Sequence, residues 1–524
     1  MGGNIMGGIL QAVNDLFAGV MPISDFLWDV PTNFNWYSSI PILGQYSLGI
    51  IFLLGIGIYF TIRLKGIQFK EFKESIRMLT HPKKEAEVGT TPLQAFLMSM
   101  GGRVGAGNIV GVTGAISIGG PGAIFWMWVS AVLGMSTAFA EGTLAQIYKE
   151  RKGDEYVGGF TFYTQKLWRN KVWVGTAMCV LYLIYNLMSI PVHTFHVFTS
   201  MSTIMDTALN RTTDVTEPVY YVVAVVIIVV IAIIAFGGIK KAVGFADAAV
   251  PTMALIYIAV AVLLMVANIT KLPAFFVTIF TQAFKPQSIF GGTFGIALAQ
   301  GLKRGLLSNE AGMGSATQAA AVSDQDHPCE QGIMQSIGVF IDTVVICTLT
   351  GFIVAGGAIW ENPNIDWSSI KYNKMATFVA SIRELTPGTA LDSIVVIVVI
   401  LAFGLFAFTT LCCDITYSEI AAHKVSDKKG VIKAVRVAGA FVFVPLGTLT
   451  VLSGLQLDNL WAVSDLVNIV LVFVNVPTLF IGRKIIIAAY KDYKAHKGER
   501  FVSARIGVKS DVWTEEEAKA RAQE

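Results

Sequence analysis

The chain has 524 residues, of which 54% are hydrophobic and only 14% are charged, and its mean hydropathy is +0.62. Soluble globular proteins carry roughly 25% charged residues, so this composition excludes an ordinary soluble enzyme or binding domain. It indicates an all-α protein that crosses a lipid bilayer many times. The net charge of +3 gives no indication of nucleic-acid binding, and we expect no nucleic-acid partner.

The N-terminal region lacks the positive segment of a cleavable signal peptide, since the first basic residue is Arg63. Residues 5–21 predict instead an amphipathic helix at the outer membrane interface. The cysteines lie mostly in apolar runs without metal-ligand spacing, and we expect them to be small buried side chains. They are Cys179, Cys329, Cys347, Cys412 and Cys413.

Apolar stretches of membrane-spanning length, about 20 residues, predict eleven transmembrane helices. They cover approximately residues 43–63, 92–118, 122–149, 172–206, 218–238, 243–267, 274–302, 330–358, 390–422, 431–453 and 459–482. The domains that follow are an outer or interfacial N-terminal segment (1–42), a transmembrane domain (43–482) and a cytoplasmic C-terminal tail (483–524). Basic residues early in this tail are expected to touch anionic lipid.

The distribution of Lys and Arg predicts the orientation of these spans. With the N-terminus outside, the segments on the cytoplasmic side hold 32 of the 39 basic residues, Lys303 and Arg304 among them. Six others lie outside, and Arg103 lies within a span. This bias predicts a plasma-membrane protein with its N-terminus outside and its C-terminus in the cytoplasm.

A glycine-rich cluster, residues 101–108, interrupts the second span. Its sequence is GGRVGAGN. Irregular backbone at membrane depth survives only where it lines a protein-enclosed or watery cavity, and interrupted spans point to the binding site of a secondary transporter. A packing helix with small residues is the alternative. Four glycines and an arginine in seven residues favour the broken helix.

A second glycine cluster, GGTFG at 291–295, interrupts the seventh predicted span. If the first span is peripheral, ten spans remain, and the two interrupted ones open two sets of five that run in opposite directions. This is the order expected of inverted repeats whose broken helices meet at the bilayer midplane. The sequence therefore predicts a five-plus-five inverted-repeat fold with one extra N-terminal helix.

The ninth span carries a polar stripe, formed by Thr409, Thr410 and Asp414, on an otherwise apolar helix. Hydroxyl, carbonyl and carboxylate oxygens suit a hard cation, although the hydroxyls could instead bond the carbonyls of their own helix. An intramembrane Asp costs about 2.5–3.5 kcal/mol on insertion scales, so Asp414 should face a cavity or a partner. We expect Arg103, Glu141 and Asp342 to form structural ion pairs inside the bundle.

Signatures of enzymes are weak in this chain. Residues 105–111 space their glycines as GxGxxxG and follow no strand, so a dinucleotide site is not indicated, and the Walker lysine motif of ATP-driven pumps is absent from the sequence. His193 and Asp414 form the one nucleophile–base type of pair that an intramembrane enzyme could use. A passive channel would share the polar midplane without needing paired broken helices.

Several motifs resemble those of the alanine-or-glycine:cation symporter family, the sodium:alanine symporters. The matching stretches are VGAGNI (104–109), GGPGA (119–123), FWMW (125–128), KRGLLSNEAGMGSA (303–316), FIDT (340–343) and FTT (408–410). The similarity runs from about residue 43 to 482. It implies the five-plus-five symporter fold and import of a small neutral amino acid with sodium, by a protein that is not an enzyme.

The resemblance also implies site residues. Sodium would be held by the carbonyls of Gly101, Val104 and Phe406 and by the hydroxyls of Thr409 and Thr410. The amides of Gly105, Ala106 and Gly107 would receive the substrate carboxylate. Asn108, His193, Thr410 and Asp414 complete the substrate-facing set, and the partners would be an amino acid, sodium and the lipid bilayer, with the protein a monomer.

Three substrate-facing positions depart from the pattern of the family. Ala106 stands where relatives usually have Thr, Asp414 where they have Trp, and His193 where they have Gln. Exchange of Trp for Asp removes an apolar wall and adds a carboxylate, so a larger polar substrate such as glutamine becomes an expectation beside alanine and glycine. The alternative is a proton-coupled or cationic amino acid carrier that uses Asp414 and His193.

Overall fold

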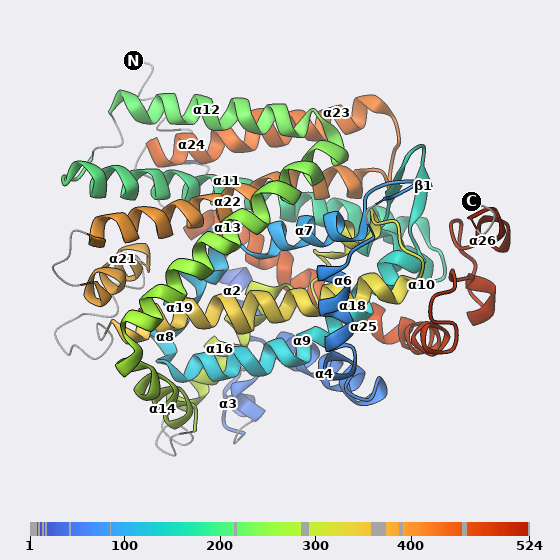
Figure 1. The fold of residues 1–524 in the computed structure, drawn as a ribbon, viewed down its shortest axis with the longest axis horizontal. Helices are drawn as coiled ribbons and strands as arrows, with labels where there is room; N and C mark the ends of the chain where they lie inside the picture. Colours follow the sequence, from blue (N-terminus) through green and yellow to red (C-terminus); the bar gives the residue numbers. More distant parts are fainter. Residues whose placement is uncertain are drawn as a thin grey trace.

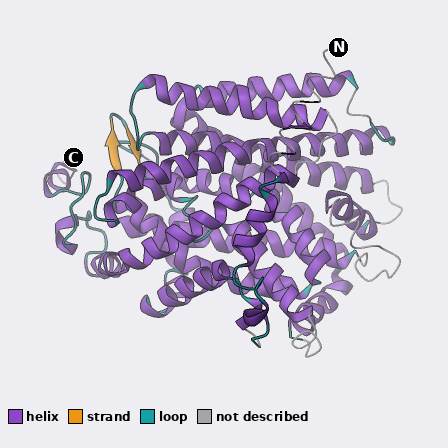
Figure 2. Ribbon diagram, turned by 180° about the vertical axis from the view of Figure 1, so that it is seen from behind, coloured by secondary structure: helices purple, strands orange, loops and turns teal. Residues whose placement is uncertain are grey.

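The computed structural model describes residues 18–40, 43–83, 85–213, 217–284, 293–357, 374–386, 391–452 and 458–521, with a few single positions before residue 18. Nearly all of this chain is helical (Figure 2). The principal helices of the first half are α2 (Met21–Asp29), α3 (Asn35–Ser38), α4 (Leu48–Arg63), α5 (Ile67–Lys70), α6 (Phe72–Thr80), α7 (Pro92–Arg103), α8 (Val110–Gly119), α9 (Gly122–Ile147), α10 (Phe160–Leu167), α11 (Val172–Leu209), α12 (Pro218–Ala235), α13 (Gly238–Ala267) and α14 (Leu272–Ala283).

The second half continues the helical series. Its helices are α16 (Thr293–Asn309), α17 (Thr317–Ala321), α18 (Pro328–Val339), α19 (Cys347–Gly356), α21 (Lys374–Leu385), α22 (Leu391–Ala422), α23 (Lys429–Ala438), α24 (Val444–Leu452), α25 (Asp458–Ala495) and α26 (Glu515–Arg521). Short 3-10 segments, η1 (Leu43–Gln45), η2 (Ala106–Asn108), η3 (Ile269–Lys271) and η7 (Ser503–Ile506), and π-helical turns, η4 (Phe340–Ile346) and η6 (Gly439–Phe443), join them.

Within the described residues, eight helices are long and apolar enough to cross a membrane. The shorter α4 and the interrupted pairs α7–α8 and α16–α17 are the other candidates for crossing, so the elements follow the predicted five-plus-five order after α4. The chain is an all-α polytopic membrane protein, as predicted. The count of eleven spans stays a prediction.

The connecting elements gather at two opposite ends of the bundle (Figure 1). One end carries α6, α10, α26 and a hairpin of β1 (Glu150–Lys152) and β2 (Glu155–Val157), in which Arg151 pairs with Tyr156. The other end carries α14 and α21. Since β1 and α6 lie in segments rich in Lys and Arg, the first end corresponds to the predicted cytoplasmic side.

The first interruption is confirmed. Helix α7 begins at the N-cap Thr91, whose hydroxyl accepts from the Gln94 amide in a capping box, and it ends at Arg103. Residues 104–109, here called the first break, hold only the 3-10 turn η2, and α8 then runs to Gly119. Gly120 ends α8 with a φ of 71°, a left-handed value that glycine accommodates without strain.

The second interruption was predicted at the wrong place. Gly291 and Gly292 lie outside the described residues, and Thr293 to Gly295 begin the continuous helix α16. The irregular backbone is instead at residues 310–316, here called the second break, between α16 and α17. The predicted span 274–302 is therefore two separate helices, α14 and α16.

Lys303 was predicted on the side opposite to the N-terminal segment, but it lies beside that segment. Its Nζ lies 4.9 Å from the ring centroid of Trp28, in the N-terminal helix α2, and its charge interacts with those of Asp29 and Asp465. Lys303 and Arg304 are therefore part of α16, and Lys303 lies on the same side of the bundle as the N-terminal segment. The remaining Lys and Arg bias is still large.

The C-terminal tail (residues 496–521) is docked on the end of the bundle that is predicted to be cytoplasmic. Trp513 is fully buried and its Nε1 donates to the carbonyl of Gln146 at 2.7 Å, at the end of α9. The Phe501 amide donates to the carbonyl of Asp326 at 2.8 Å, just before α18. The tail therefore ties α9 and α18 to the extension of α25.

Two other predicted features fall largely outside the described residues. They are the interfacial helix at 5–21 and most of the connection between the predicted spans 330–358 and 390–422, of which the structure describes α21.

Candidate functional site

Four of the five predicted sodium ligands come together between the first break and α22. The Thr410 hydroxyl donates to the carbonyl of Gly101 at 3.1 Å and to that of Phe406 at 3.0 Å. The Thr409 hydroxyl donates to the same Phe406 carbonyl at 2.9 Å. The two hydroxyls therefore bond a carbonyl of their own helix, and Thr410 also contacts α7. The resulting cluster consists of oxygen atoms, which suit a hard cation.

The first break packs closely against Thr410. A Cβ atom on Gly105 would lie 2.8 Å from the Thr410 hydroxyl, so glycine is required at this close approach. Val104, the C-cap of α7, has an extended conformation that turns its carbonyl out of the helical direction. The first break thus brings backbone groups that are not bonded within a helix to Thr409 and Thr410, here called the hydroxyl stripe of α22.

Asn108 lies behind the break rather than toward the hydroxyl stripe. Its Oδ1 accepts from the Gly105 amide at 2.9 Å, and its Nδ2 donates to the Asp342 carboxylate at 2.6 Å. The side chain is fully buried. Asn108 therefore holds the shape of the first break. Gly107 borders the end of α16, because a Cβ atom added to it would lie 3.7 Å from the Ser308 Cα.

His193 and Asp414 are neighbours across two helices. The His193 Nε2 lies 3.7 Å from the Asp414 Oδ2, and α11 and α22 carry the two residues. Asp414 is one helical turn beyond Thr410, which places the pair next to the hydroxyl stripe. Two of the residues that depart from the family pattern are thus brought together beside the first break.

Glu141 was expected in an ion pair, and this expectation is wrong. Its Oε1 accepts from the amides of Gly312 and Gly314 at 3.0 and 2.9 Å and from the Asn475 Nδ2 at 2.6 Å. No cation lies within ion-pair distance of it among the described residues. Glu141 instead satisfies backbone donors that the second break leaves free, which explains a carboxylate inside the bundle.

Asp342 is also held by neutral donors instead of the expected ion pair. Asn108 donates to Oδ1, while Ser308 and Thr343 donate to Oδ2 at 2.9 and 2.8 Å. The residue lies in the π-helical turn of residues 340–346, a rare geometry found often at functional sites. Asp342 therefore joins the first break, α16 and the turn between α18 and α19.

Arg103, the third residue expected in an ion pair, has a hydrogen bond to a neutral group. Its Nη2 donates to the Gln335 Oε1 at 3.3 Å, and its Nε and Nη1 have no hydrogen-bond partner in the described structure. The side chain is 3% exposed. A buried guanidinium with two free donor groups is costly. Its charge acts on the nearby carboxylates of Glu141, Glu310 and Asp342.

Sequence reasoning missed Glu310 as a site residue, although it stood in a matching motif. It opens the second break with a φ of 57°, a left-handed value that is rare for a non-glycine residue and that collects at functional sites. Its carboxylate accepts from the Ser315 hydroxyl at 2.5 Å. A Glu followed by two glycines in the next four residues was the signal that could have located this break.

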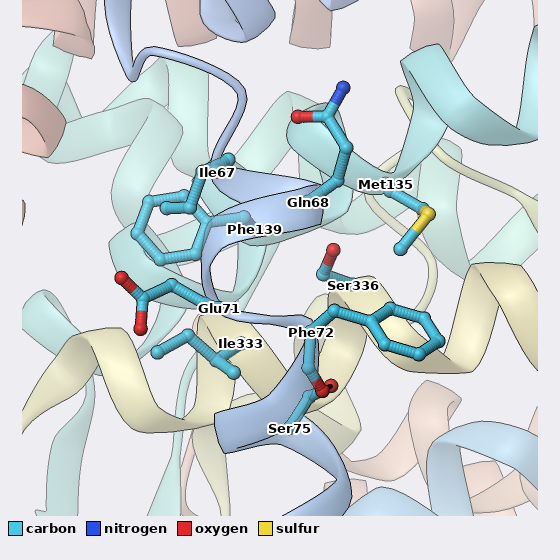
Figure 3. Close-up of a pocket in the computed structure, with 9 residues that line it drawn as sticks. All are labelled: Ile67, Gln68, Glu71, Phe72, Ser75, Met135, Phe139, Ile333 and Ser336. Atoms are coloured by element: carbon cyan, nitrogen blue, oxygen red, sulfur yellow. Dashed lines mark hydrogen bonds between the residues drawn. The ribbon is translucent and has the colours of Figure 1, made fainter.

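A separate small cavity, with room for about one water molecule, lies between α5–α6, α9 and α18 (Figure 3). Its wall is largely apolar, with Phe72, Phe139 and Met135 beside Gln68 and Ser336. None of the predicted sodium or substrate residues lines it. This cavity is therefore distinct from the site at the first break.

The model of the sodium:alanine symporter family matches residues 34–504. The chain belongs to this family. Its members are transporters, so the protein is a sodium-coupled amino acid symporter of the membrane and not an enzyme.

Relatives cover nearly the same length. The chain is 35% identical to the probable sodium/glutamine symporter GlnT of Bacillus subtilis, over 86% of this chain and 88% of that protein. It is 34% identical to the amino-acid carrier protein AlsT of the same organism, over 94% and 98%. Among solved structures, MhsT in complex with L-phenylalanine is similar with a TM-score of 0.48 and 14% identity, over 77% of this chain and 100% of that one.

Proposed function

We propose that this symporter imports a neutral amino acid together with sodium by alternating access between the two sides of the plasma membrane. The substrate is of the alanine and glycine class or a larger polar amino acid such as glutamine. The observation that carries the proposal is the convergence of the Gly101 and Phe406 carbonyls on the Thr409 and Thr410 hydroxyls at the first break.

In this proposal the sodium ion binds those four groups and the carbonyl of Val104. Binding then requires the first break and α22 to stay together, because the carbonyls of Gly101 and Val104 come from α7 and the first break, whereas α22 supplies the hydroxyls. The substrate carboxylate binds the amides of Gly105, Ala106 and Gly107. Sodium next to these amides favours an anion, which couples the two ligands electrostatically.

The side chain of the substrate faces Thr410, His193 and Asp414, with Asn108 holding the break from behind. An imidazole and a carboxylate 3.7 Å apart can offer both a donor and an acceptor. A carboxamide side chain needs one of each, and the relative named as a probable sodium/glutamine symporter supports this assignment. The transport unit is a monomer with its N-terminus outside and its C-terminal tail in the cytoplasm.

The test is uptake of labelled amino acids into proteoliposomes with and without an inward sodium gradient. A potential of −100 mV adds about 2.3 kcal/mol per charge, and a tenfold gradient adds about 1.4 kcal/mol. Together they support an accumulation of several hundred-fold per sodium ion. Uptake that proceeds equally in sodium-free buffer and follows a proton gradient would favour the second candidate, a proton-coupled or cationic amino acid carrier based on the Asp414–His193 pair.

A further inference from the structure

The buried charges between the two breaks are not matched in pairs. Arg103 ends α7 with its Nε and Nη1 free of hydrogen-bond partners. Glu310 begins the second break, and no cation lies within ion-pair distance of it among the described residues. The charge of Arg103 is nevertheless close enough to attract Glu310, as it also attracts Glu141 and Asp342.

Glu310 occupies a central place between Arg103 and the predicted substrate residues. Its charge also interacts with that of Asp414. Glu310, His193 and Gly107 keep accessible surface although helices surround them. The neighbouring helices therefore cover the Glu310 side chain only in part.

We propose that Glu310 binds the α-ammonium group of the substrate and that Arg103 is its counter-ion when the substrate is absent. The inference rests on the proposed function and assigns the ammonium subsite that it leaves open. In an amino acid, the ammonium nitrogen lies about 2.5 Å from the carboxylate carbon. A carboxylate seated on the first break therefore directs the ammonium group to a close neighbour of that break.

The second break is that neighbour. Gly107 lies against Ser308, two residues before Glu310. Glu141 is occupied by Gly312, Gly314 and Asn475, and Asp342 by three neutral donors. Glu310 has the fewest hydrogen-bond donors of these three carboxylates, so its oxygen atoms remain available to a cationic ligand.

Arg103 acts as a positioning residue through Glu310. In the empty protein its positive charge compensates the carboxylate from the end of α7, which draws the two broken helices together. A bound ammonium group takes over this compensation, so substrate and Arg103 compete for the charge of Glu310. Removal of Arg103 should therefore strengthen substrate binding, whereas removal of the Glu310 charge should weaken it.

Ligand-induced thermal stabilisation of the purified full-length protein in detergent and saturating sodium tests this inference. The ligands are L-alanine and L-glutamine and the same acids without the amino group, propionate and glutaramate. We expect Glu310→Gln to weaken binding of the amino acids about tenfold or more, the loss of one hydrogen bond to a charged group. Binding of the deaminated acids should change little.

Arg103→Gln should shift amino acid binding in the opposite direction and make it several-fold tighter. In the Glu310→Gln background the same change should have no further effect, and Arg103→Lys should restore wild-type binding. Glu330→Gln is the matched control, because Glu330 caps α18 through the amides of Asp326 and His327 at 3.3 Å and an amide oxygen can accept the same bonds.

Equal weakening by Arg103→Gln and Glu310→Gln, or an unchanged preference for amino acids over deaminated acids in Glu310→Gln, would overturn the inference. If Arg103→Gln does not fold, Glu310→Asp decides, since it keeps the charge and should bind better than Glu310→Gln. Sodium-independent uptake by the wild-type protein would contradict the proposed function alone, because this binding assay requires no transport.

Discussion

The imidazole of His193 and the carboxylate of Asp414 lie 3.7 Å apart, one on α11 and the other on α22. Either residue alone is an unusual polar group at membrane depth, and together they form a donor–acceptor pair beside Thr410 and the first break. The pair stands where most relatives are expected to carry Gln and Trp. Its most direct consequence is for the size and polarity of the substrate.

Asp414→Trp should shift substrate preference toward alanine and glycine, because the indole refills the space and removes the carboxylate. Uptake of the larger polar substrate should fall by about tenfold or more, as expected for losing a hydrogen bond to a charged group. Competition uptake with a panel of amino acids measures the ranking. Asp392→Trp, the same change near the other end of α22, is the control and should keep the wild-type order; an identical order in Asp414→Trp would contradict this role of the pair.

Thr410→Val should raise the sodium concentration needed for half-maximal uptake, since the valine keeps the shape and removes one oxygen ligand. Loss of a ligand worth about 1.5–3 kcal/mol corresponds to an increase of about tenfold or more. Sodium titration of uptake measures the shift. Thr416→Val is the matched control because the Thr416 hydroxyl bonds only the Cys412 carbonyl of its own helix, at 2.9 Å; equal sodium dependence in both variants would place the cation elsewhere.

The predicted orientation can be read by chemical labelling. Single cysteines in a cysteine-free variant should react with an impermeant maleimide from outside when placed at 207–217 or 359–389. Cysteines at 425–430 should react only after the membrane is permeabilised. Labelling of 425–430 in intact cells would show that the orientation is inverted.

Acid should loosen the docked C-terminal tail. His327 packs between Tyr493 and Phe501, and burial lowers its pKa from 6.5 to about 4 although Asp492 opposes this. The exposed imidazole takes up a proton at a higher pH than the docked one, so docking is fully stable above about pH 6.5 and weakens as the pH falls toward 4.

Hydrogen exchange of residues 500–513 between pH 7.5 and 5 measures this effect, after correction for the intrinsic pH dependence of exchange. Protection should fall with pH in the wild-type protein. His327→Asn removes the titrating ring while keeping a side-chain oxygen at the N-cap, and its protection should depend much less on pH. A wild-type tail that stays equally protected throughout would show that His327 does not control docking.

The sequence predicted the features that depend on local composition and spacing. Four glycines around Arg103 located the first break, and the hydroxyl stripe located the part of α22 that contacts it. The second break was missed because Lys303 and Arg304 read as the end of a span. In the folded protein Trp28, Asp29 and Asp465 stabilise the charge of Lys303. Partners from such distant segments cannot be recognised from the local sequence pattern.

The same reason explains the errors over intramembrane charges. Opposite charges in a membrane sequence predict ion pairs, yet Glu141 and Asp342 accept hydrogen bonds from amides and hydroxyls instead. The amides that bond Glu141 become available because the second break interrupts the helix. The role of a buried carboxylate therefore depends on backbone irregularity elsewhere in the chain.

Helix α25 has 38 residues, and at a rise of about 1.5 Å per residue it is about 57 Å long. The hydrocarbon core of a bilayer is about 30 Å thick, so a substantial part of this helix extends beyond the membrane. Any tilt of its membrane-spanning part produces a larger displacement at the C-terminal end of the helix, where Lys494 pairs with Glu71 and the tail begins. A fluorescent or spin label near residue 496 would report the conformational cycle of the carrier from the aqueous phase, without a probe in the transport pathway.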